Sequence, residues 1–319
     1  MAFDIITMGA SIVEIIRKDI DTELYTDAEF LGPYASGDTP IFINAAARLG
    51  SKTALITSMG DDDFGKCCIN KLAEAGVDLT YAKMHPDNYT GSAFSMYRSD
   101  GSRKFLYHLT GSGSSMADVY GFTKEYFAGA KWVHYTGFTL ESSESYREAV
   151  YRSLELLDPE TKISFDPNIR PELYSADEIR EMCRPIIERA DIMMPSGEEA
   201  ILFTKAATEE EACRMMTDGG KKLVVQKRGS EGSRFFVKGG IVEVPAFKAA
   251  ELDPTGAGDT FDAALLTALI EGKSLEEAGH FANAAGAFAV TKKGPMEGAI
   301  SRKQLDAFLA SGKTEAKLN

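Results

Sequence analysis

Short apolar segments and amphipathic segments alternate along most of the chain. The apolar segments lack the every-second-residue polarity of a half-exposed strand, which is typical of strands buried on both faces of a parallel sheet. Segments of this kind are 3–8, 53–58, 131–135, 162–165, 191–194 and 222–226.

Helical patterns fill the intervals between these strands. They cover 40–49, 64–75, 145–157, 176–188 and 209–218, and the end of the chain from 256 to about 310 is almost entirely helical in pattern. Strands that alternate with helices predict an α/β fold in which helices cover both faces of a mostly parallel central sheet. We expect one domain over residues 1–319.

Residues 12–36 and 90–109 interrupt this alternation. Residues 92–98 and 103–108 read as two strands around a polar turn, which predicts a hairpin and not a strand–helix–strand unit. Together with 12–17 the hairpin would form a small separate sheet, and such a sheet beside a ligand cleft is a candidate lid. An ordinary surface hairpin is the alternative.

Bulky side chains alternate along this hairpin. We expect them to give the lid one apolar face that needs a partner, and therefore a homodimer that pairs through the lid. The side chains in question are Phe94, Met96, Phe105 and Tyr107.

The charge excludes several classes of partner. The 319 residues carry a formal net charge of -13, which argues against nucleic acid and anionic membranes. No apolar run approaches the length of a membrane span, and no basic and apolar leader opens the sequence. The four cysteines lack metal-ligand spacing, which favours a reducing, cytoplasmic setting.

Residues 253–260 read Asp-Pro-Thr-Gly-Ala-Gly-Asp-Thr and lead directly into the apolar stretch 261–270. Gly256 and Gly258 allow a tight turn and a close approach to a ligand, and the first N–H groups of a helix bind anions. A carboxylate there would repel phosphate, so Asp259 makes chemical sense as a base that takes the proton of a hydroxyl attacking that phosphate. The alternative is an acid that only favours the helix start.

Motifs of other enzyme classes are absent from the sequence. It contains no Gly-x-x-x-x-Gly-Lys-Ser/Thr and no Gly-x-Ser-x-Gly, and its histidines are scattered without metal spacing. P-loop proteins and serine hydrolases are therefore not supported.

With this motif at a late helix start, the sequence resembles the ribokinase-like (PfkB) carbohydrate kinases over nearly its whole length. The motifs that carry the resemblance are 253–260, 36–40, 44–50, 59–65, 166–170, 195–199, 227–229 with Gly232, and 282–287. The resemblance implies a three-layer sandwich with a β-sheet lid, and transfer of phosphate from ATP, with Mg²⁺, to a hydroxymethyl group.

The resemblance also implies roles at the reacting centre. Asp259 would be the catalytic base, and the N–H groups of Gly256, Ala257 and Gly258 would form the anion hole. Glu199 matches the acid that organises Mg²⁺ through water in the family's Asn-x-x-Glu motif. Ser196 replaces the asparagine of that motif.

Further matches lie on the sugar side and the nucleotide side. The residues that the resemblance places at the sugar are Gly37, Asp38, Asn44, Glu14, His108 and Arg170. Those that it places at ATP are Ser196, Arg228, Gly229, Gly232 and Asn283. Asp253 and Thr255 match positions that bind a monovalent cation such as K⁺ in some members.

The sequence therefore predicts an ATP-dependent kinase of a small sugar, in the branch that acts on ketoses or 2-keto-3-deoxy sugar acids. A nucleoside kinase is the alternative. A sensor without activity on the same fold would need a lost base or a broken anion hole, and both are intact.

Overall fold

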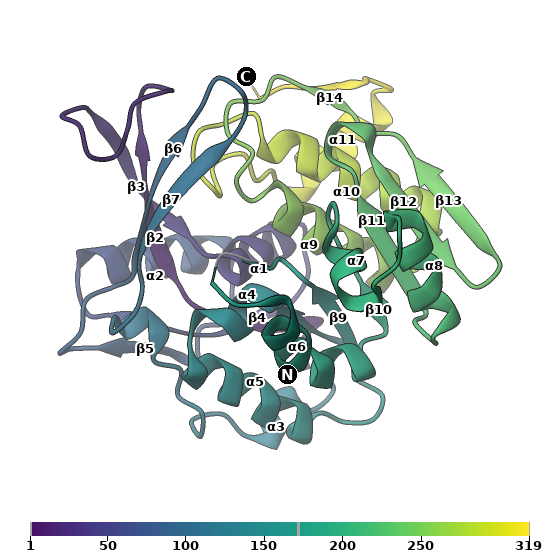
Figure 1. Cartoon of the computed structure of the whole chain (residues 1–319), viewed down its shortest axis with the longest axis horizontal. Coiled ribbons are helices and arrows are strands. Elements are labelled where there is room, and N and C mark those ends of the chain that lie inside the picture. Colours follow the sequence, from purple (N-terminus) through teal and green to yellow (C-terminus); the bar gives the residue numbers. More distant parts are fainter. Residues whose placement is uncertain (1, 171–172, 319) are drawn as a thin grey trace.

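The computed structural model describes residues 2–170 and 173–318, and its core is a nine-stranded sheet in the order β13-β12-β11-β10-β9-β8-β1-β4-β5 (Figure 1). The strands are β1 (Ile5–Met8), β4 (Thr53–Gly60), β5 (Ala82–His85), β8 (Trp132–Thr136), β9 (Lys162–Asp166), β10 (Ile192–Met193), β11 (Leu223–Lys227), β12 (Ser233–Val237) and β13 (Gly240–Val244). From β5 to β11 every neighbouring pair is parallel, and β12 and β13 are antiparallel.

The strand order places a ligand crevice at the carboxyl edge of the sheet. β1 lies between β4 and β8, so the chain builds the sheet outward in both directions from β1. Connections then diverge to opposite sides, and such points are where open α/β sheets bind ligands.

Successive residues of the strands pack into two different cores. Ile5 belongs to one core and Ile6 to the other, and Val225 and Val224 divide in the same way. This alternation follows from the two-residue period of a strand. The sheet is therefore buried on both faces, which explains the continuous apolar runs of the sequence.

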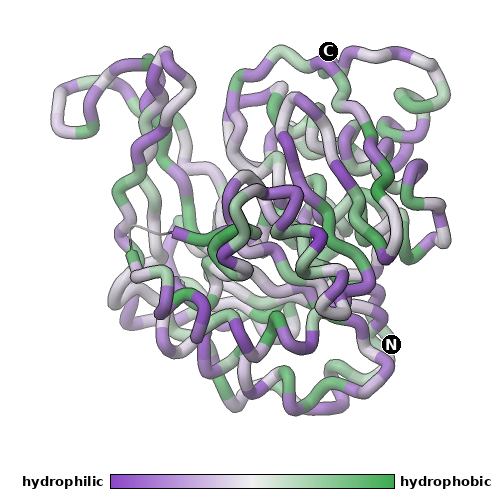
Figure 2. The backbone as a smooth tube through the Cα atoms, turned by 45° about the vertical axis from the view of Figure 1, so that its right-hand side comes forward, coloured by the Kyte–Doolittle hydropathy of each residue, from purple (hydrophilic) through white to green (hydrophobic). Residues whose placement is uncertain are grey.

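Helices cover both faces. One core packs against α1 (Asp38–Arg48), α2 (Asp63–Ala75), α9 (Ala257–Ile270), α10 (Leu275–Ala289) and α11 (Arg302–Ala310). The other packs against α3 (Lys124–Phe127), α4 (Gly137–Ser142), α5 (Glu144–Leu156), α6 (Ala176–Arg189), α7 (Glu199–Thr204) and α8 (Glu209–Asp218). Along the outer helices the backbone in Figure 2 changes repeatedly between hydrophobic and hydrophilic colours, as expected of helices with one buried side.

A four-stranded sheet stands apart from this body, at the upper left of Figure 1. Its order is β3 (Phe30–Ser36), β2 (Ile12–Arg17), β6 (Ser92–Tyr97) and β7 (Arg103–His108). The prediction of a mostly parallel central sheet, helices on both faces and a small second sheet is confirmed.

The expectation that Phe94, Met96, Phe105 and Tyr107 together give the hairpin one apolar face is wrong. Phe94 lies opposite Leu106 and Ala93 lies opposite Tyr107, and cross-strand partners share a face. The aromatic side chains therefore divide: Tyr107 points to the same side as Glu14, whereas Phe94 points to the other. Below, these are called the inner and outer faces of the small sheet.

The remaining strands are β14 (Lys248–Ala249) and β15 (Glu315–Ala316), which pair in parallel near the end of the chain. Across the described residues, no helix combines the length and the apolar composition that a membrane crossing requires.

Candidate active site

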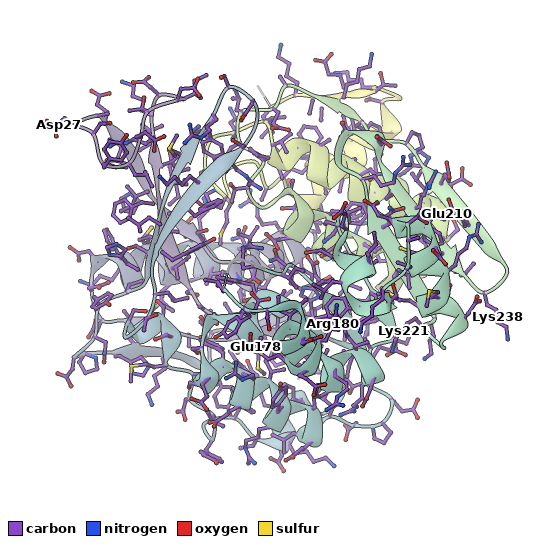
Figure 3. The ribbon with its side chains drawn as sticks, in the orientation of Figure 1. Asp27, Glu178, Arg180, Glu210, Lys221 and Lys238 are labelled. Atoms are coloured by element: carbon purple, nitrogen blue, oxygen red, sulfur yellow. The ribbon has the colours of Figure 1, made fainter. Side chains whose placement is uncertain are left out.

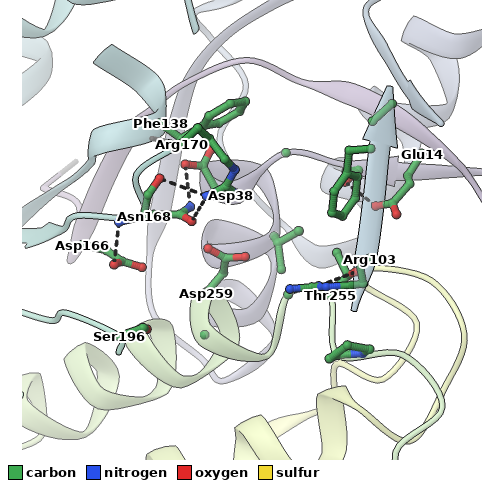
Figure 4. A pocket seen from close by; sticks show the side chains of 18 of the residues that line it. Glu14, Asp38, Arg103, Phe138, Asp166, Asn168, Arg170, Ser196, Thr255 and Asp259 are labelled. Carbon is green, nitrogen blue, oxygen red and sulfur yellow. Dashed lines mark hydrogen bonds between the residues drawn. The ribbon is translucent and has the colours of Figure 1, made fainter. Parts of the chain in front are cut away.

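A cavity of about 640 Å³ lies between the inner face of the small sheet, the start of α9 and the carboxyl ends of the central strands (Figure 4). Asp166 and Lys227, the last residues of β9 and β11, line it from the central sheet, and Glu14 lines it from the small sheet. Below, we call it the inner cavity.

A second cavity of about 770 Å³ begins where the inner cavity ends. Its walls combine the apolar side chains of Phe247, Phe261 and Val290 with the glycine-rich turn 229–232. An apolar slot beside a glycine-rich turn suits a flat base attached to phosphates. Below, we call it the outer cavity. The residues that line both cavities are Arg103, Ser196, Lys227, Pro254 and Gly258.

The start of α9 forms the boundary between the cavities. Gly256 caps the helix with φ of 81°, and a Cβ there would lie 2.5 Å from the Pro295 carbonyl oxygen, so only glycine fits. The N–H groups of Gly256 and Gly258 have no hydrogen-bond partner among the described residues, whereas that of Ala257 lies 3.4 Å from the Pro254 carbonyl oxygen. Unpartnered amides at a helix start attract an anion.

Asp259 projects from the first turn of α9 into the inner cavity, at the centre of Figure 4. Its carboxyl group accepts no hydrogen bond within the described part of the chain. Burial raises its pKa well above the usual value, the charges of Asp38 and Asp166 add to this, and Lys227 and Arg170 oppose it. A carboxylate whose pKa is raised binds a proton more strongly, so this group is suited to take one.

Asp38 is fixed by its neighbours on the other side of the cavity. It follows Gly37, whose φ of 111° turns the chain into α1. Its Oδ1 accepts from the Thr39 N–H at 2.8 Å, and its Oδ2 accepts from Thr136 Oγ1 at 2.6 Å and Asn168 Nδ2 at 3.2 Å. Burial raises the pKa of Asp38. The carboxylate can still accept from a ligand hydroxyl, because it has about four acceptor sites.

Arg170 lies beside Asp38, with its guanidinium 5.1 Å from the centre of the Phe138 ring. Its Nη1 donates to Asn168 Oδ1 at 3.0 Å and to the Ile169 carbonyl at 3.0 Å. Burial acts to lower the pKa of Arg170, but Tyr107 and the carboxyl groups of Asp38 and Asp259 raise it, so the guanidinium stays charged.

Glu14 closes the opposite wall, on β2. Its side chain accepts from Ser95 Oγ at 2.6 Å and Ser36 Oγ at 3.4 Å, and burial raises its pKa to about 7. It is therefore a buried acid that lines the cavity without a cationic hydrogen-bond partner within the described residues.

Glu199 begins α7 at the floor of the inner cavity. Its Oε1 accepts from the Ile169 N–H at 3.1 Å and its Oε2 from the Ser196 N–H at 2.7 Å. Burial, with Asp166 nearby, raises its pKa to about 7, and Lys227 opposes this. The described residues contain no cluster of three or more acidic, histidine or cysteine side chains able to hold a metal alone.

Asp253 and Thr255 precede the helix start and are joined to the small sheet. Asp253 Oδ1 accepts from the Tyr97 hydroxyl at 2.6 Å, and Oδ2 accepts from the Gly294 N–H at 2.8 Å. Thr255 Oγ1 lies 3.0 Å from the same tyrosine oxygen. Their role at a monovalent cation stays a prediction.

The residues expected at the nucleotide all line the outer cavity: Ser196, Arg228, Gly229, Gly232 and Asn283. Arg228 forms an ion pair with Glu231. Asn283 Nδ2 donates to the carbonyls of Val244 and Pro245, both at 3.1 Å, so it fixes the backbone of one wall.

The structure does not bring Asn44 or His108 to either cavity. Asn44 is buried inside α1, where its Nδ2 donates to the Lys71 carbonyl at 3.3 Å and ties α1 to α2. His108 lies on the outer face of the small sheet beside Phe94, because it is an even number of residues from Leu106 on β7.

Sequence reasoning assigned no catalytic or ligand-binding role to several residues that line the inner cavity: Asp166, Lys227, Arg103, Phe105 and Tyr107. Asp166 and Lys227 each end a central strand, and a charged residue at that place is the signal that could have singled them out. Arg103 and Tyr107 alternate on β7 with His108, so the strand period would have selected them instead of the histidine.

Comparison with known proteins agrees with this geometry. Residues 34–302 match the pfkB family carbohydrate kinases. The chain is 30% identical over 303 residues to fructokinase-1 of Oryza sativa subsp. japonica, covering 92% of this chain and 93% of that protein. It is 29% identical over 282 residues to 2-dehydro-3-deoxygluconokinase of Thermoproteus tenax, covering 86% and 85%.

Solved structures give the same result. An E. coli protein provisionally named ribokinase II superposes with a TM-score of 0.91 at 32% identity, covering 98% of this chain and all of that one. The same protein has been solved with ATP and Mg²⁺, with a TM-score of 0.90. The predicted family is confirmed: the chain belongs to the PfkB family of carbohydrate kinases and is an ATP-dependent sugar kinase.

Proposed function

We propose that Asp259 is the base that takes the proton from a sugar hydroxyl as that hydroxyl attacks the terminal phosphate of ATP. The observation that carries this proposal is a carboxyl group on the first turn of α9, where the two cavities meet, that has no hydrogen-bond partner among the described residues. A sugar in the inner cavity and a nucleotide in the outer cavity would meet in front of it. Phosphoryl transfer needs mainly this positioning and the stabilisation of charge.

The N–H groups at the start of α9 are the proposed anion hole. Those of Gly256 and Gly258 are available, and the N–H of Ala257 can join them by giving up its 3.4 Å contact. Fixed amides stabilise the charge on the phosphoryl oxygens without reorganising.

The site fits Mg²⁺ as a metal held mainly by phosphate and water. Oxygen ligands are what Mg²⁺ prefers, and it commonly uses one or two carboxylates while keeping several waters. Glu199 would supply such a carboxylate, and the absence of a metal cage among the described residues agrees with this mode. When bound, the ion would neutralise charge on the phosphates of ATP.

Asp259→Asn tests the base. The variant should lose about 10²–10⁴-fold in kcat, because the positioned proton acceptor is gone, while its affinity for ATP changes little. Steady-state kinetics and calorimetry measure the two quantities, with Asp218→Asn on the exposed end of α8 as the matched control. A kcat near that of the unmodified enzyme would show that Asp259 is not the base.

The acceptor that we propose is a ketose or a 2-keto-3-deoxy sugar acid with a terminal hydroxymethyl group. Asp38 and Glu14 provide carboxyl groups on opposite walls that accept from sugar hydroxyls. Arg170 adds a charged group that can hold a carboxylate or donate to a carbonyl. The curated relatives include kinases of both kinds of sugar.

A nucleoside acceptor is the second candidate, because aromatic side chains also line the inner cavity. Phe105 and Tyr107 lie with ring centres 5.7 Å apart at 14°, and Tyr107 lies 5.9 Å from Phe138. A flat base could stack on such a wall.

Rates with fructose, tagatose, 2-keto-3-deoxygluconate and adenosine under one set of conditions decide between these acceptors. We expect kcat/KM to be highest for one of the three sugars, and a higher value for adenosine would refute the proposed class. Arg170→Ala then separates the sugars: a sugar acid should lose about 10-fold or more in affinity with its charge-assisted bond, and a neutral ketose should lose less.

We also propose that the small sheet, formed from residues 12–36 and 90–109 within one kinase domain, is a lid over the inner cavity. Its inner face supplies Glu14, Arg103 and Tyr107 to the cavity wall, so its position decides how far the site is closed to water. Its outer face is the proposed contact between two copies of the chain.

A further inference from the structure

Lys227 is a buried lysine at the boundary of the two cavities. It ends β11, lines both cavities, and its side chain is 9% exposed. Its Nζ donates to Asp166 Oδ2 at 2.7 Å and to Asp262 Oδ2 at 3.0 Å. An ammonium group has three N–H donors, and the third has no partner among the described residues.

The ammonium group faces the start of α9. A Cβ built on Gly258 would lie 3.6 Å from Lys227 Nζ, so the missing side chain of Gly258 leaves the space between the amine and the helix start open. An anion on the N–H of Gly258 would therefore lie within reach of the amine.

Carboxyl groups surround this position. Asp166, Asp262 and Glu199 all raise the pKa of Lys227, although burial acts to lower it, and the ammonium form is therefore retained. Two of these acids hold the amine in place, with side chains that are 5% and 0% exposed. A phosphoryl group entering here meets Asp259 as well, so it needs a fixed positive charge on the protein side.

We infer that Lys227 is a catalytic residue, which donates its third N–H to the phosphoryl group in transit. This inference rests on the proposed function. In the step, the acceptor oxygen bonds to the terminal phosphorus, the bond to the bridging oxygen breaks, and ADP leaves with that electron pair. The hydroxyl proton passes to Asp259, while Lys227 keeps its proton and supplies a hydrogen bond and charge.

The test compares ligands with and without the terminal phosphate. Affinities for ADP and for the imido analogue of ATP, each with magnesium, are measured by calorimetry for the unmodified enzyme and Lys227→Met. The variant should lose about 10–100-fold in affinity for the analogue and less than about 3-fold for ADP, because only the analogue carries the phosphate that the amine contacts. Equal losses for both ligands, or none, would overturn the inference.

Lys221→Met is the matched control. Lys221 lies just before the opposite end of the same strand, where its Nζ donates to the Ala190 carbonyl at 3.0 Å, and it lines neither cavity (Figure 3). This variant removes a half-buried lysine without touching the site, so it should leave both affinities unchanged. If Lys227→Met does not fold, Lys227→Gln undergoes the same measurement, and its melting curve is recorded first.

The experiments on Asp259 and Lys227 test the two proposals independently. Asp259→Asn retains Lys227 and should keep the preference for the analogue over ADP. Turnover retained in Asp259→Asn would refute the base and leave the Lys227 inference standing, whereas an unchanged preference in Lys227→Met would refute only the latter.

Discussion

At the scale of single residues, Glu14 is a buried acid at a position where a neutral amide would make the folded protein more stable. It is 2% exposed, and both of its hydrogen-bonding neighbours are neutral serines. Its pKa of about 7 means that the folded protein binds this proton more tightly than the unfolded chain does. Stability therefore falls as the pH rises from the usual glutamate value, near 4.5, to about 7.

We predict that Glu14→Gln raises the melting temperature at pH 8 and leaves it nearly unchanged at pH 5. The difference between the two pKa values corresponds to about 3 kcal/mol at most, which the neutral amide avoids above pH 7. The same change should lower kcat/KM for the sugar, because one of the two acceptor oxygens becomes an NH₂ donor. Scanning calorimetry at both pH values measures the first effect.

Glu178→Gln is the matched control for this prediction. Glu178 lies on the surface at the start of α6 (Figure 3), where hydrogen bonds to Ser175 in the capping box lower its pKa. Its substitution should not stabilise the protein at pH 8. If Glu14→Gln gave the same change in melting temperature at both pH values, Glu14 would not be the titrating group.

The sequence predicts a site residue well when the residues that position it are close to it in the chain. The helix start at 256–259 is local, so glycines and an acid at fixed spacing are enough to suggest the proposed anion hole and the proposed base. The predictions that Asn44 and His108 contact the sugar were wrong, because one turn of helix or one step along a strand changes the direction of a side chain. The position of Lys227 in the site was not predicted, because its partners Asp166 and Asp262 are distant from it in sequence.

At the scale of elements, the side chain of Tyr97 joins β6 to the loop before α9. Tyr97, at the end of β6, donates to Asp253 and contacts Thr255, and Asp253 in turn accepts from the Thr255 N–H at 3.0 Å. The position of the small sheet is thereby linked to the backbone that leads to the proposed anion hole.

We predict that Tyr97→Phe lowers kcat about 10-fold or more. Without the hydroxyl, a buried oxygen of Asp253 keeps only its backbone donor, so the loop loses a contact that fixes the helix start. Tyr135→Phe is the control, since its hydroxyl lies 2.7 Å from Ser153 Oγ in the core, away from both cavities. The control should lower the melting temperature and spare kcat, and an unchanged kcat in Tyr97→Phe would show that this contact does not position the site.

The elements themselves were predictable where their pattern is strong. Strands β1, β4, β8, β9 and β11 are mainly apolar and almost entirely buried, and a parallel sheet buried on both faces demands such runs. The antiparallel edge β12–β13 was not predicted, because its exposed side interrupts the apolar pattern. Assigning side chains to the two faces of the small sheet requires the pairing register of its strands, which the sequence alone does not supply.

At the scale of the whole molecule, the outer face of the small sheet carries apolar side chains that the described residues leave partly exposed. Ile15, Phe94 and Leu106 lie in one row across β2, β6 and β7, and Phe30 packs its ring edge against Phe94 at 5.7 Å. Leu106 is 49% exposed and Phe30 is 40% exposed. Adjacent exposed apolar side chains on a small sheet indicate a contact surface.

We predict a dimer in which two copies join through this outer face, and a monomer when Leu106 is replaced by Glu. A charge in the middle of the row would have to be buried without a partner, which opposes association. Light scattering coupled to gel filtration measures the mass, with Met215→Glu as the control because Met215 is 46% exposed on α8, away from the small sheet. A monodisperse monomer of the unmodified protein would rule out the pairing. A Leu106→Glu variant that stays dimeric would place the contact elsewhere.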